Sequence, residues 1–359
     1  MPMPQGRDLE LTRKQLREFF AAELPDAEDL RLSPLRGPGT TGFSNDTLMF
    51  DLEWREGGRA RREALVVRIS PSGVRVFPDY DLGLQYRVLR QLEPTSVPVP
   101  RVRWMNADGR VLGDPFYVME RVEGRIPPDN PTYHAEGWMT EIEDSDREAI
   151  WWSGLEVLTR IHRLDWPRLG FDFLLTAKAG ADPLGEQLEY YERFLAWAAE
   201  GRPQPTTSAA LEELKRRRPP LERLALCWGD SRLGNMIFRE NRCVAVLDWE
   251  MAIVADPEQD LAWWLFFDEH HSSGADIPRL GGLPSRAETV ARYQEWTGWK
   301  VRHLEYYEAF AAFRFAVIMI RIARMLAAHG LLPEDSEFER NNTCTRMLAR
   351  MLDLPPPEA

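Results

Sequence analysis

The sequence predicts an α+β protein built as two lobes, a small sheet-rich lobe followed by a large, mainly helical one. Two observations point to this class. Up to about residue 120, apolar side chains alternate along short segments bounded by Gly, Pro and Asp, which is the pattern of half-buried antiparallel strands. From about Glu143 onward, apolar residues recur every three or four positions instead, which is typical of helices packed on a core. Clefts between such lobes are common sites for small ligands.

The sheet-rich part is expected to begin with a helix over Arg13–Leu24, where apolar residues share one face and Thr12 is placed to cap the amino end. Two strands are then expected at Thr47–Trp54 and Ala64–Ser70, and the Gly-Gly pair at 57–58 indicates a hairpin turn between them. A helix and two extended segments complete this part, near Tyr80–Leu92, Val97–Trp104 and Pro115–Glu120.

The helical part is interrupted once, where Met236–Arg239 and Val244–Asp248 have the pattern of two short strands joined by a turn. A helix is expected to start soon afterwards. Asp256 is placed to cap it, Pro257 suits its first position, and Gln259 completes an arrangement like a capping box. These three residues are therefore interpreted as structural. The same interpretation applies to the histidine at position 162, which we expect to be packed and hydrogen-bonded.

Composition and charge exclude several classes of protein. A length of 359 residues suits one large or two modest domains. Hydrophobic residues make up 44% of the chain, with 13 Trp and 16 Phe, which is globular and not disordered composition. The formal net charge is −12, so we expect no nucleic-acid partner and no membrane surface as partner.

The cysteines and apolar segments bear on the compartment. The three cysteines lie at unrelated spacings without a CxxC pair, which favours a reduced, cytosolic protein. The first 15 residues lack the apolar stretch of a signal peptide, and the apolar segment Phe315–Leu326 is interrupted by two arginines. We therefore expect a soluble cytoplasmic protein. The sequence leaves its oligomeric state open.

The strongest chemical signal surrounds the short hairpin. Asp230 and Asn235 lie on the loop that enters it, within CWGDSRLGNMIF at 227–238, and Asp248 lies where its second strand is expected to end. Phosphoryl transfer needs such a set: a carboxylate that positions and deprotonates the attacking hydroxyl, and an Asn and an Asp that hold Mg²⁺. Each residue alone is also a common turn residue. Their combination at one hairpin favours catalysis.

Further matches extend these motifs. Three segments match the pattern of a known family, which is His-Gly-Asp-x-x-x-x-Asn, then a strand ending Asp-Trp-Glu, then Gly-Asp-Pro-x-x-Asp-Leu-Ala. The matching residues are, in order, Gly229-Asp230 with Asn235, Asp248-Trp249-Glu250, and Asp256-Pro257 with Asp260-Leu261-Ala262. Other matches are Gly42–Asn45, Tyr86–Leu89, Val97–Pro100 and Phe116–Glu120. Over roughly residues 30 to 270 the sequence thus resembles the aminoglycoside phosphotransferase and choline-kinase-like family of small-molecule kinases. Within that family it resembles the branch related to the kinase domains fused to acyl-CoA dehydrogenases.

The resemblance implies a protein-kinase-like fold, with an N-lobe at residues 1–122 and a helical C-lobe at 123–359 that holds the catalytic hairpin and the acceptor pocket. It also implies transfer of the γ-phosphoryl group of ATP, with Mg²⁺, to a hydroxyl of a small molecule. The implied site residues are Asp230 as catalytic base, Asn235 and Asp248 as Mg²⁺ ligands, Gly42 and Ser44 in a phosphate-covering loop, Arg68 on a strand facing the phosphates, and Glu120 and Val122 at the hinge that pairs with adenine.

Three positions depart from the family pattern. Trp228 replaces a His that organises the catalytic loop, and Arg68 replaces a Lys. Gln85 stands where the family has a Glu paired with that cation; its amide can hydrogen-bond Arg68 but supplies no charge, and Asp79 or Asp81 are nearby substitutes. These departures leave a second function open, a nucleotide-binding pseudokinase that acts as a sensor or interaction module. The intact Asp/Asn/Asp set argues for catalysis.

The acceptor pocket is expected in the helical part after Trp264. The residues placed to line it are Asp268, Glu269, His270, His271 and the helix Tyr306–Leu326 with Arg314, Arg321 and Arg324. The acidic group favours a cationic acceptor and the arginines favour a phosphorylated or acyl-CoA-like one, while both groups are also typical of solvated helix faces. The sequence leaves open whether the acceptor is an antibiotic, a hydroxyacyl compound or another metabolite, and whether the donor is ATP or GTP.

Overall fold

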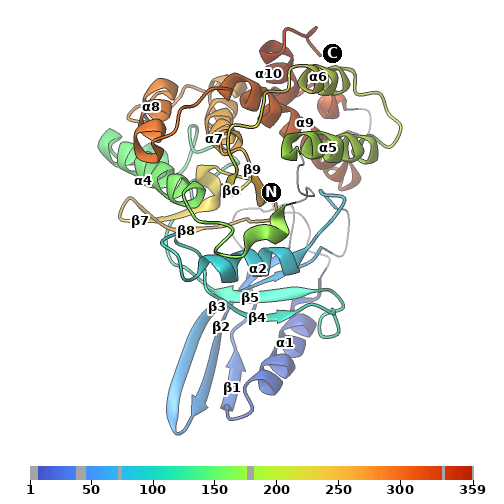
Figure 1. The fold of residues 1–359 in the computed structure, drawn as a ribbon. Coiled ribbons are helices and arrows are strands. Elements are labelled where there is room, and N and C mark those ends of the chain that lie inside the picture. The colour runs from blue at the N-terminus through green and yellow to red at the C-terminus, as the bar shows by residue number, and fades with distance from the viewer. Residues whose placement is uncertain (1–6, 38–45, 72–74, 176–181, 334–335, 358–359) are drawn as a thin grey trace.

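The computed structural model describes residues 7–37, 46–71, 75–175, 182–333 and 336–357. Within these residues a five-stranded sheet with two helices forms one end of the molecule, and a larger helical part forms the other (Figure 1). The elements of the first part are α1 Leu9–Glu23, β1 Glu28–Leu32, β2 Asp46–Glu56, β3 Arg59–Ile69, α2 Leu82–Leu92, β4 Val102–Asn106 and β5 Phe116–Glu120. The strand order is β1-β2-β3-β5-β4, with every neighbouring pair antiparallel. The predicted α+β class is confirmed.

One face of the sheet packs against α1. Alternate residues of β2 point to that face, and Phe50 and Leu52 are at most 1% exposed. The ring of Phe20 on α1 lies 5.7 Å from that of Phe50 and 5.2 Å from that of Trp104 on β4. Figure 1 shows α2 beside the sheet, toward the helical part. The two faces of the sheet therefore belong to two apolar clusters, one closed by α1 and one continuous with the helical core.

Several ends of these elements differ from the prediction. The first helix begins at Leu9, and Thr12 is not its cap. The carboxylate of Asp8 accepts hydrogen bonds from the backbone N–H groups of Glu10 and Leu11, both at 3.0 Å. Because Asp caps a helix at least as well as Thr and stands earlier in the chain, the helix gains a turn. Helix α2, in turn, begins at Leu82, two residues later than expected, because Asp81 is its cap.

The extended segment predicted from residue 97 forms a strand only from Val102, because Pro98 and Pro100 have no N–H to donate to a ladder. The hairpin predicted at 47–70 is confirmed. Strand β2 ends two residues later than predicted and β3 begins five residues earlier, so the pairing extends to Glu56 and Arg59 beside the turn.

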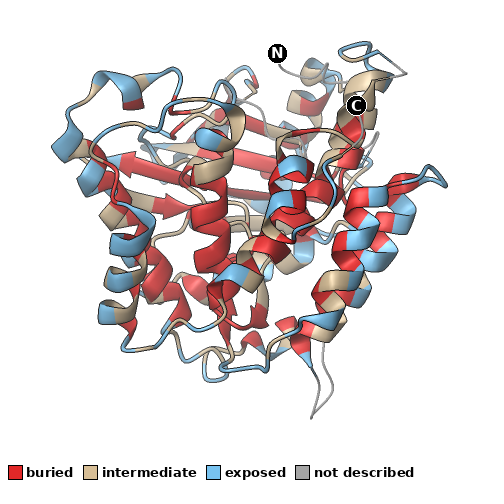
Figure 2. Cartoon of the chain, turned by 90° about the horizontal axis from the view of Figure 1, so that it is seen from above, coloured by how far each residue is buried: buried red, intermediate tan, exposed pale blue. Residues whose placement is uncertain are grey.

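The remaining helices are α3 Trp138–Glu141, α4 Asp144–His162, α5 Pro183–Ala199, α6 Pro205–Arg216, α7 Glu258–His271, α8 Arg286–Thr297, α9 Leu304–Ala328 and α10 Thr343–Met351, with 3₁₀ turns at Phe171–Leu174, Leu233–Asn235, Ser273–Ala275 and Glu337–Glu339. Helices α7 and α9 form the centre of this part; the rings of Phe267 and Phe315 lie 4.6 Å apart between them. Figure 2 shows buried residues on the inward faces of the helices and along the strands, and exposed residues on the outer turns. No described helix is long and apolar enough to cross a membrane.

Two short antiparallel pairs interrupt the helices. Strands β6 Ala225–Cys227 and β9 Ile253–Ala255 form one pair, and β7 Met236–Arg239 and β8 Arg242–Val246 form the predicted hairpin. Strand β8 ends two residues earlier than expected, so Asp248 lies in the loop that follows it.

The start of α7 also differs from the prediction. Pro257 is the N-cap and not the first helical residue, and no side-chain hydrogen bond caps the helix, so the expected capping box with Gln259 is wrong. Asp256 still has a structural role, since its carboxylate accepts from the N–H groups of Glu258 (3.0 Å) and Glu222 (3.3 Å). It therefore ties the start of α7 to the segment before β6.

Candidate active site

A cavity of about 340 Å³ lies between the sheet and the helical part. It gathers five predicted site residues: Arg68 from β3, Glu120 and Val122 from the end of β5 and the segment after it, and Asn235 and Asp248 from the two sides of the β7–β8 hairpin. The predicted phosphate-loop residues Gly42 and Ser44 lie outside the described residues. The chain thus brings residues that are up to 180 positions apart to one wall.

Asp230 lies at the edge of this wall, and its carboxylate accepts three hydrogen bonds. Oδ1 accepts from Nε1 of Trp263 (2.8 Å) and Nε of Arg232 (3.0 Å), and Oδ2 accepts from Nδ2 of Asn235 (2.6 Å). These donors fix the orientation of the carboxylate, because each occupies a defined lone-pair direction. Trp263 and Arg232 were not predicted as site residues. Arg232 stands two positions after Asp230, which is the signal that could have found it.

Arg232 also forms an ion pair between its Nη1 and Asp129, a residue of the segment after β5. Both residues line the cavity. Burial alone would raise the pKa of Asp129, but Arg232 and His271 hold that pKa below its usual value. His271 Nδ1 lies 3.9 Å from Asp129 Oδ1. Arg232 therefore bridges two carboxylates, Asp230 and Asp129, both of which it keeps in fixed positions.

The second predicted metal ligand, Asp248, pairs with Arg68. Nη2 of Arg68 donates to Oδ1 of Asp248 at 2.6 Å. Asp248 has a φ of 57°, a left-handed conformation that is uncommon for a residue other than Gly and costs about 1–3 kcal/mol. Arg68 is buried; desolvation lowers its pKa, but the charge of Asp248 outweighs this effect and the pKa stays above its ordinary value. The predicted strand cation is thus held at the hairpin.

Gln85 does not hold this cation. Its buried amide oxygen accepts from the hydroxyl of Tyr117 at 3.4 Å, and among the described residues Arg68 hydrogen-bonds only to Asp248. The expected Gln85–Arg68 hydrogen bond is therefore not formed. Asp81 is not a substitute either, because it caps α2.

Trp228 takes a definite place in the loop. Its indole Nε1 donates to the carbonyl oxygens of Leu247 (2.8 Å) and Asp248 (3.2 Å), and its backbone N–H donates to Asp260 Oδ2 (2.6 Å). The side chain is fully buried. Trp228 thus joins the loop before Asp230 to the loop that carries Asp248.

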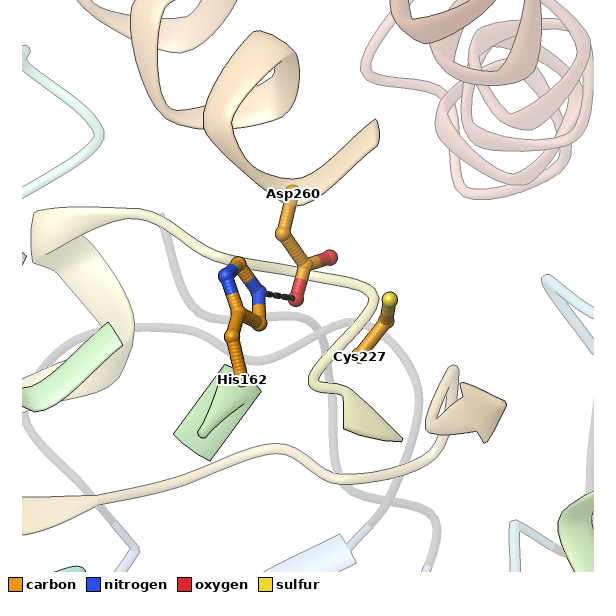
Figure 3. Close-up of side chains that lie close together, drawn as sticks. All are labelled: His162, Cys227 and Asp260. Atoms are coloured by element: carbon orange, nitrogen blue, oxygen red, sulfur yellow. Dashed lines mark hydrogen bonds and ion pairs between the residues drawn. The ribbon is translucent and has the colours of Figure 1, made fainter. Parts of the chain in front are cut away.

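His162, Cys227 and Asp260 are buried close together below this loop (Figure 3). His162 contacts Asp260 Oδ2 through Nε2 (3.2 Å) and the hydroxyl of Tyr293 through Nδ1 (2.8 Å). Asp260 Oδ1 also accepts from the N–H of Gly229 (2.9 Å). Burial raises the pKa of the Cys227 thiol well above its usual value. Although these types of residue can bind metal, each is already hydrogen-bonded within the fold, with the Cys227 thiol donating to the carbonyl oxygens of Ala225 and Ala255. The cluster therefore supports the loop, as predicted for His162.

The predicted acceptor residues are mostly engaged elsewhere. Asp268 is buried and accepts from Arg279 Nε (2.6 Å) and from the hydroxyl of Tyr133 (3.0 Å). Glu269 pairs with Arg350 on the exposed side of the helix. These carboxylates therefore do not line the site, because partners distant in sequence already neutralise or cover them.

Two of the predicted arginines are also structural. Arg321 donates from Nε and Nη2 to the carbonyl oxygen of Arg75, at 3.2 and 3.1 Å, and from Nη1 to Glu200 (2.7 Å). Arg324 pairs with Glu339 at 3.2 Å. Both guanidinium groups connect elements of the fold.

Arg314, in contrast, lines a second cavity of about 580 Å³ formed by α2, α5, α9 and the segment after Asp248. The charged and phenolic residues around it are Asp79, Asp81, Glu186, Glu189, Glu250, Arg193, Arg314, Tyr80, Tyr190 and Tyr191.

Arg314 connects this second cavity to the loop that carries Asp230. Its Nη2 donates to the carbonyl oxygen of Gly229 at 2.9 Å. Gly229 has a φ of 91°, and a Cβ there would lie 2.1 Å from the carbonyl oxygen of Met251, so only Gly fits. The wall of the second cavity thus lies one residue from Asp230.

The chain is similar to known proteins in sequence and in fold. Over 295 residues it is 30% identical to acyl-CoA dehydrogenase family member 10 of Mus musculus; the match covers 77% of this chain and 25% of that protein, so the chain spans about a quarter of its length. A solved protein of Ralstonia eutropha, assigned as an aminoglycoside phosphotransferase, superposes with a TM-score of 0.64 and 23% identity over 96% of both chains. A thermostable mutant of aminoglycoside phosphotransferase APH(4)-Ia, solved in ternary complex with ADP and hygromycin B, gives a TM-score of 0.50 and 15% identity over 94% of this chain and 98% of the other.

The two structural similarities show that the fold is kinase-like, as the resemblance implied. The family profile of phosphotransferase enzymes matches residues 40–310, which include the predicted catalytic base, metal ligands and nucleotide-binding residues. The branch predicted from acyl-CoA dehydrogenase relatives is confirmed by the mouse protein. By this match over most of its length, the chain belongs to the phosphotransferase enzyme family.

Proposed function

We propose that the protein transfers the γ-phosphoryl group of ATP to a hydroxyl of a small molecule, with Mg²⁺ as cofactor and Asp230 as catalytic base. One observation carries the proposal. Asp230 is hydrogen-bonded to Asn235, and Asn235 shares the cavity wall with Asp248 and Arg68. A base, two oxygen ligands and a cation in one place are the parts that phosphoryl transfer requires.

The oxygen atoms suit Mg²⁺. Asn235 donates from Nδ2 to the carboxylate and the carbonyl oxygen of Asp230, which leaves its Oδ1 as the outward atom. Among the described residues, neither Oδ1 of Asn235 nor Oδ2 of Asp248 takes part in a hydrogen bond. Carboxylate and amide oxygens are the ligands that Mg²⁺ prefers. When bound there, the ion would neutralise charge on the nucleotide phosphates.

ATP as donor is supported by the relatives and by the shape of the cavity. The related APH(4)-Ia structure contains ADP. In this chain the cavity runs from Glu120 and Val122, the proposed adenine partners, to Arg68 and Asp248. A nucleotide in that orientation places its base at the end of β5 and its phosphates at the hairpin.

Asp230 would position the acceptor hydroxyl and receive its proton. A loose phosphoryl-transfer transition state depends more on positioning and charge neutralisation than on a strong base. The hydrogen bonds from Trp263 and Arg232 supply that positioning, because they hold Oδ1 in one direction.

The acceptor would enter through the second cavity. Leu247 and Asp248 line the nucleotide cavity, whereas Glu250–Ile253, in the same segment, line the second one. Arg314, which lines the second cavity, is hydrogen-bonded to Gly229, next to Asp230. The two cavities would thus hold donor and acceptor on either side of one loop.

The second candidate function is a nucleotide-binding pseudokinase, and one observation favours it. Arg68 pairs with Asp248, a proposed metal ligand, and not with a carboxylate on α2. The two functions are distinguished by thermal shift with ATP, with and without Mg²⁺, beside an ATPase assay over a panel of hydroxyl compounds. A Mg²⁺-dependent shift with phosphorylation of a panel member supports the kinase. A shift without turnover on any compound supports the pseudokinase, and no shift at all contradicts both.

A further inference from the structure

We propose that Arg232 is a further catalytic residue, which donates a hydrogen bond from Nη2 to the phosphoryl group during its transfer. The inference rests on the proposed phosphotransfer. It assigns to Arg232 the stabilisation of charge on the transferred group, and to Asp129 the positioning of Arg232.

The place of Arg232 is the first ground. It lines the nucleotide cavity together with Asn235 and Asp248, the proposed metal ligands. It also donates to Asp230, the proposed base, at 3.0 Å. A phosphoryl group that lies within reach of both the metal ligands and Asp230 therefore lies within reach of this guanidinium.

The hydrogen bonding of the guanidinium is the second ground. Nε is engaged by Asp230 and Nη1 by Asp129, so two of its three nitrogens are fixed by side chains of the site. Among the described residues, Nη2 has no hydrogen-bond partner. A planar guanidinium that is fixed on two sides presents its remaining N–H groups in a defined direction, which is how Arg binds phosphate oxygens with geometric specificity.

The charge of the site is the third ground. Three carboxylates, Asp129, Asp230 and Asp248, are ion-paired with two cations, Arg68 and Arg232. The cavity is also lined by Glu120, Arg121 and Glu123, and Arg121 is paired with Asp51 and Glu123. Arg68 lies on β3 and is paired with Asp248. Arg232 is the cation bonded to the base itself, so it is placed where charge develops on the transferred group.

The step can be written in full. The bond between the γ-phosphorus and the oxygen that bridges it to the β-phosphate breaks, and a bond forms between the acceptor oxygen and the γ-phosphorus. The hydroxyl proton passes to Asp230, and ADP leaves with the bridging oxygen. Arg232 keeps its protons throughout, since its pKa lies far above neutral pH.

The test compares MgADP with MgADP plus aluminium fluoride, which mimics the planar phosphoryl group, by titration calorimetry on the full chain. In the wild type, fluoride should tighten ADP binding at least about tenfold. Arg232→Gln should reduce this gain to less than about twofold while MgADP binds within about threefold of wild type. It should also slow ATP hydrolysis on the order of 100-fold or more. Arg232→Lys keeps the positive charge but lacks the planar guanidinium with its several N–H groups, so it should retain a part of the gain.

Arg279→Gln is the control, because it removes another arginine that is paired with a carboxylate, Asp268, and lies outside both cavities; its side chain is 31% exposed, against 19% for Arg232. It should keep the full fluoride gain. Asp129→Asn should lower the gain in part, since Arg232 loses one of its two fixing partners.

A full gain in Arg232→Gln, or in Arg232→Lys if the first variant does not fold, would overturn the inference. So would the absence of any gain in a wild type that binds MgADP. A wild type that binds neither MgADP nor MgATP would instead refute the proposed function, and the inference with it.

Discussion

Trp228 and Asp248 are joined by a hydrogen bond from the indole nitrogen to a backbone carbonyl oxygen, at 3.2 Å, and the same N–H reaches the carbonyl oxygen of Leu247. The indole therefore connects the loop that carries the proposed base to the loop that carries a proposed metal ligand. This N–H gives Trp228 the loop-organising role that the resemblance assigns to a His at this position. The departure at Trp228 thus gives no support to a loss of activity.

Trp228→Phe should destabilise the fold and weaken MgATP binding. Loss of the indole N–H leaves two buried carbonyl groups without this donor, which costs about 1–3 kcal/mol in unfolding free energy. The measurements are urea unfolding and calorimetric titration with MgATP. Trp249→Phe is the control, because Trp249 is equally buried and donates to Val246 at 3.2 Å. It should lose similar stability but keep nucleotide affinity; equal loss of affinity in both variants would contradict a specific role for Trp228.

Asp230→Asn should lose turnover and keep nucleotide binding. The amide is a poor base and cannot accept the hydroxyl proton, so we expect kcat to fall about 100- to 10,000-fold. ATP should bind within about threefold of wild type. Initial rates on the acceptor found by the panel, with the ATP Kd measured separately, check both. Equal kcat in variant and wild type would show that Asp230 is not the base.

Asp248→Asn should reduce the dependence of ATP binding on Mg²⁺. In the wild type we expect ATP to bind at least about tenfold more tightly with Mg²⁺ than with a chelator. The variant keeps the shape of the side chain but loses its charge, so the ratio of ATP affinities with and without Mg²⁺ should approach one. ATP in the presence of the chelator should bind as it does to the wild type. Calorimetric titrations under both conditions give the ratio. An unchanged ratio would remove Asp248 from the metal site.

Stability should fall between pH 6.5 and pH 4 because of His271. Burial lowers the pKa of this imidazole from 6.5 to about 4, although Asp129 opposes the shift. In that interval the unfolded chain binds a proton that the folded protein does not, so the unfolding free energy decreases as pH falls, by up to about 1.4 kcal/mol per pH unit for this group. Above pH 6.5 the group is neutral in both states and contributes no slope. Urea unfolding of wild type and His271→Phe over this range measures the difference, and parallel slopes would contradict it.

The order of elements and the central hairpin could be predicted because they depend on local patterns. Alternating apolar residues fix β2 and β3, and the turn between β7 and β8 has Glu240 and Asn241 at φ 51° and 59°, which local sequence can indicate. Helix ends were less predictable where two capping residues compete, as Asp8 and Thr12 do.

The partners of the site residues could not be predicted, because they come from distant parts of the chain. Asp129 is 103 residues from Arg232, and Tyr133 is 135 residues from Asp268. Asp268 looked like an acceptor residue because its own helix does not show that Arg279 and Tyr133 cover it. An isolated charge in a sequence therefore indicates a function only after its counter-charge is located.

The hydrogen bonds from Arg321 to the carbonyl oxygen of Arg75 span 246 positions of the chain and connect α9 to the segment shortly after β3. They lie outside the residues that line the nucleotide cavity. A rigid-body separation of the sheet from the helices must either break this tether or rotate about it. The segment after β5 joins the two parts as well, because Arg125 exchanges two backbone hydrogen bonds with Phe238 of β7. A relative motion that keeps both connections is therefore a rotation about the line between them.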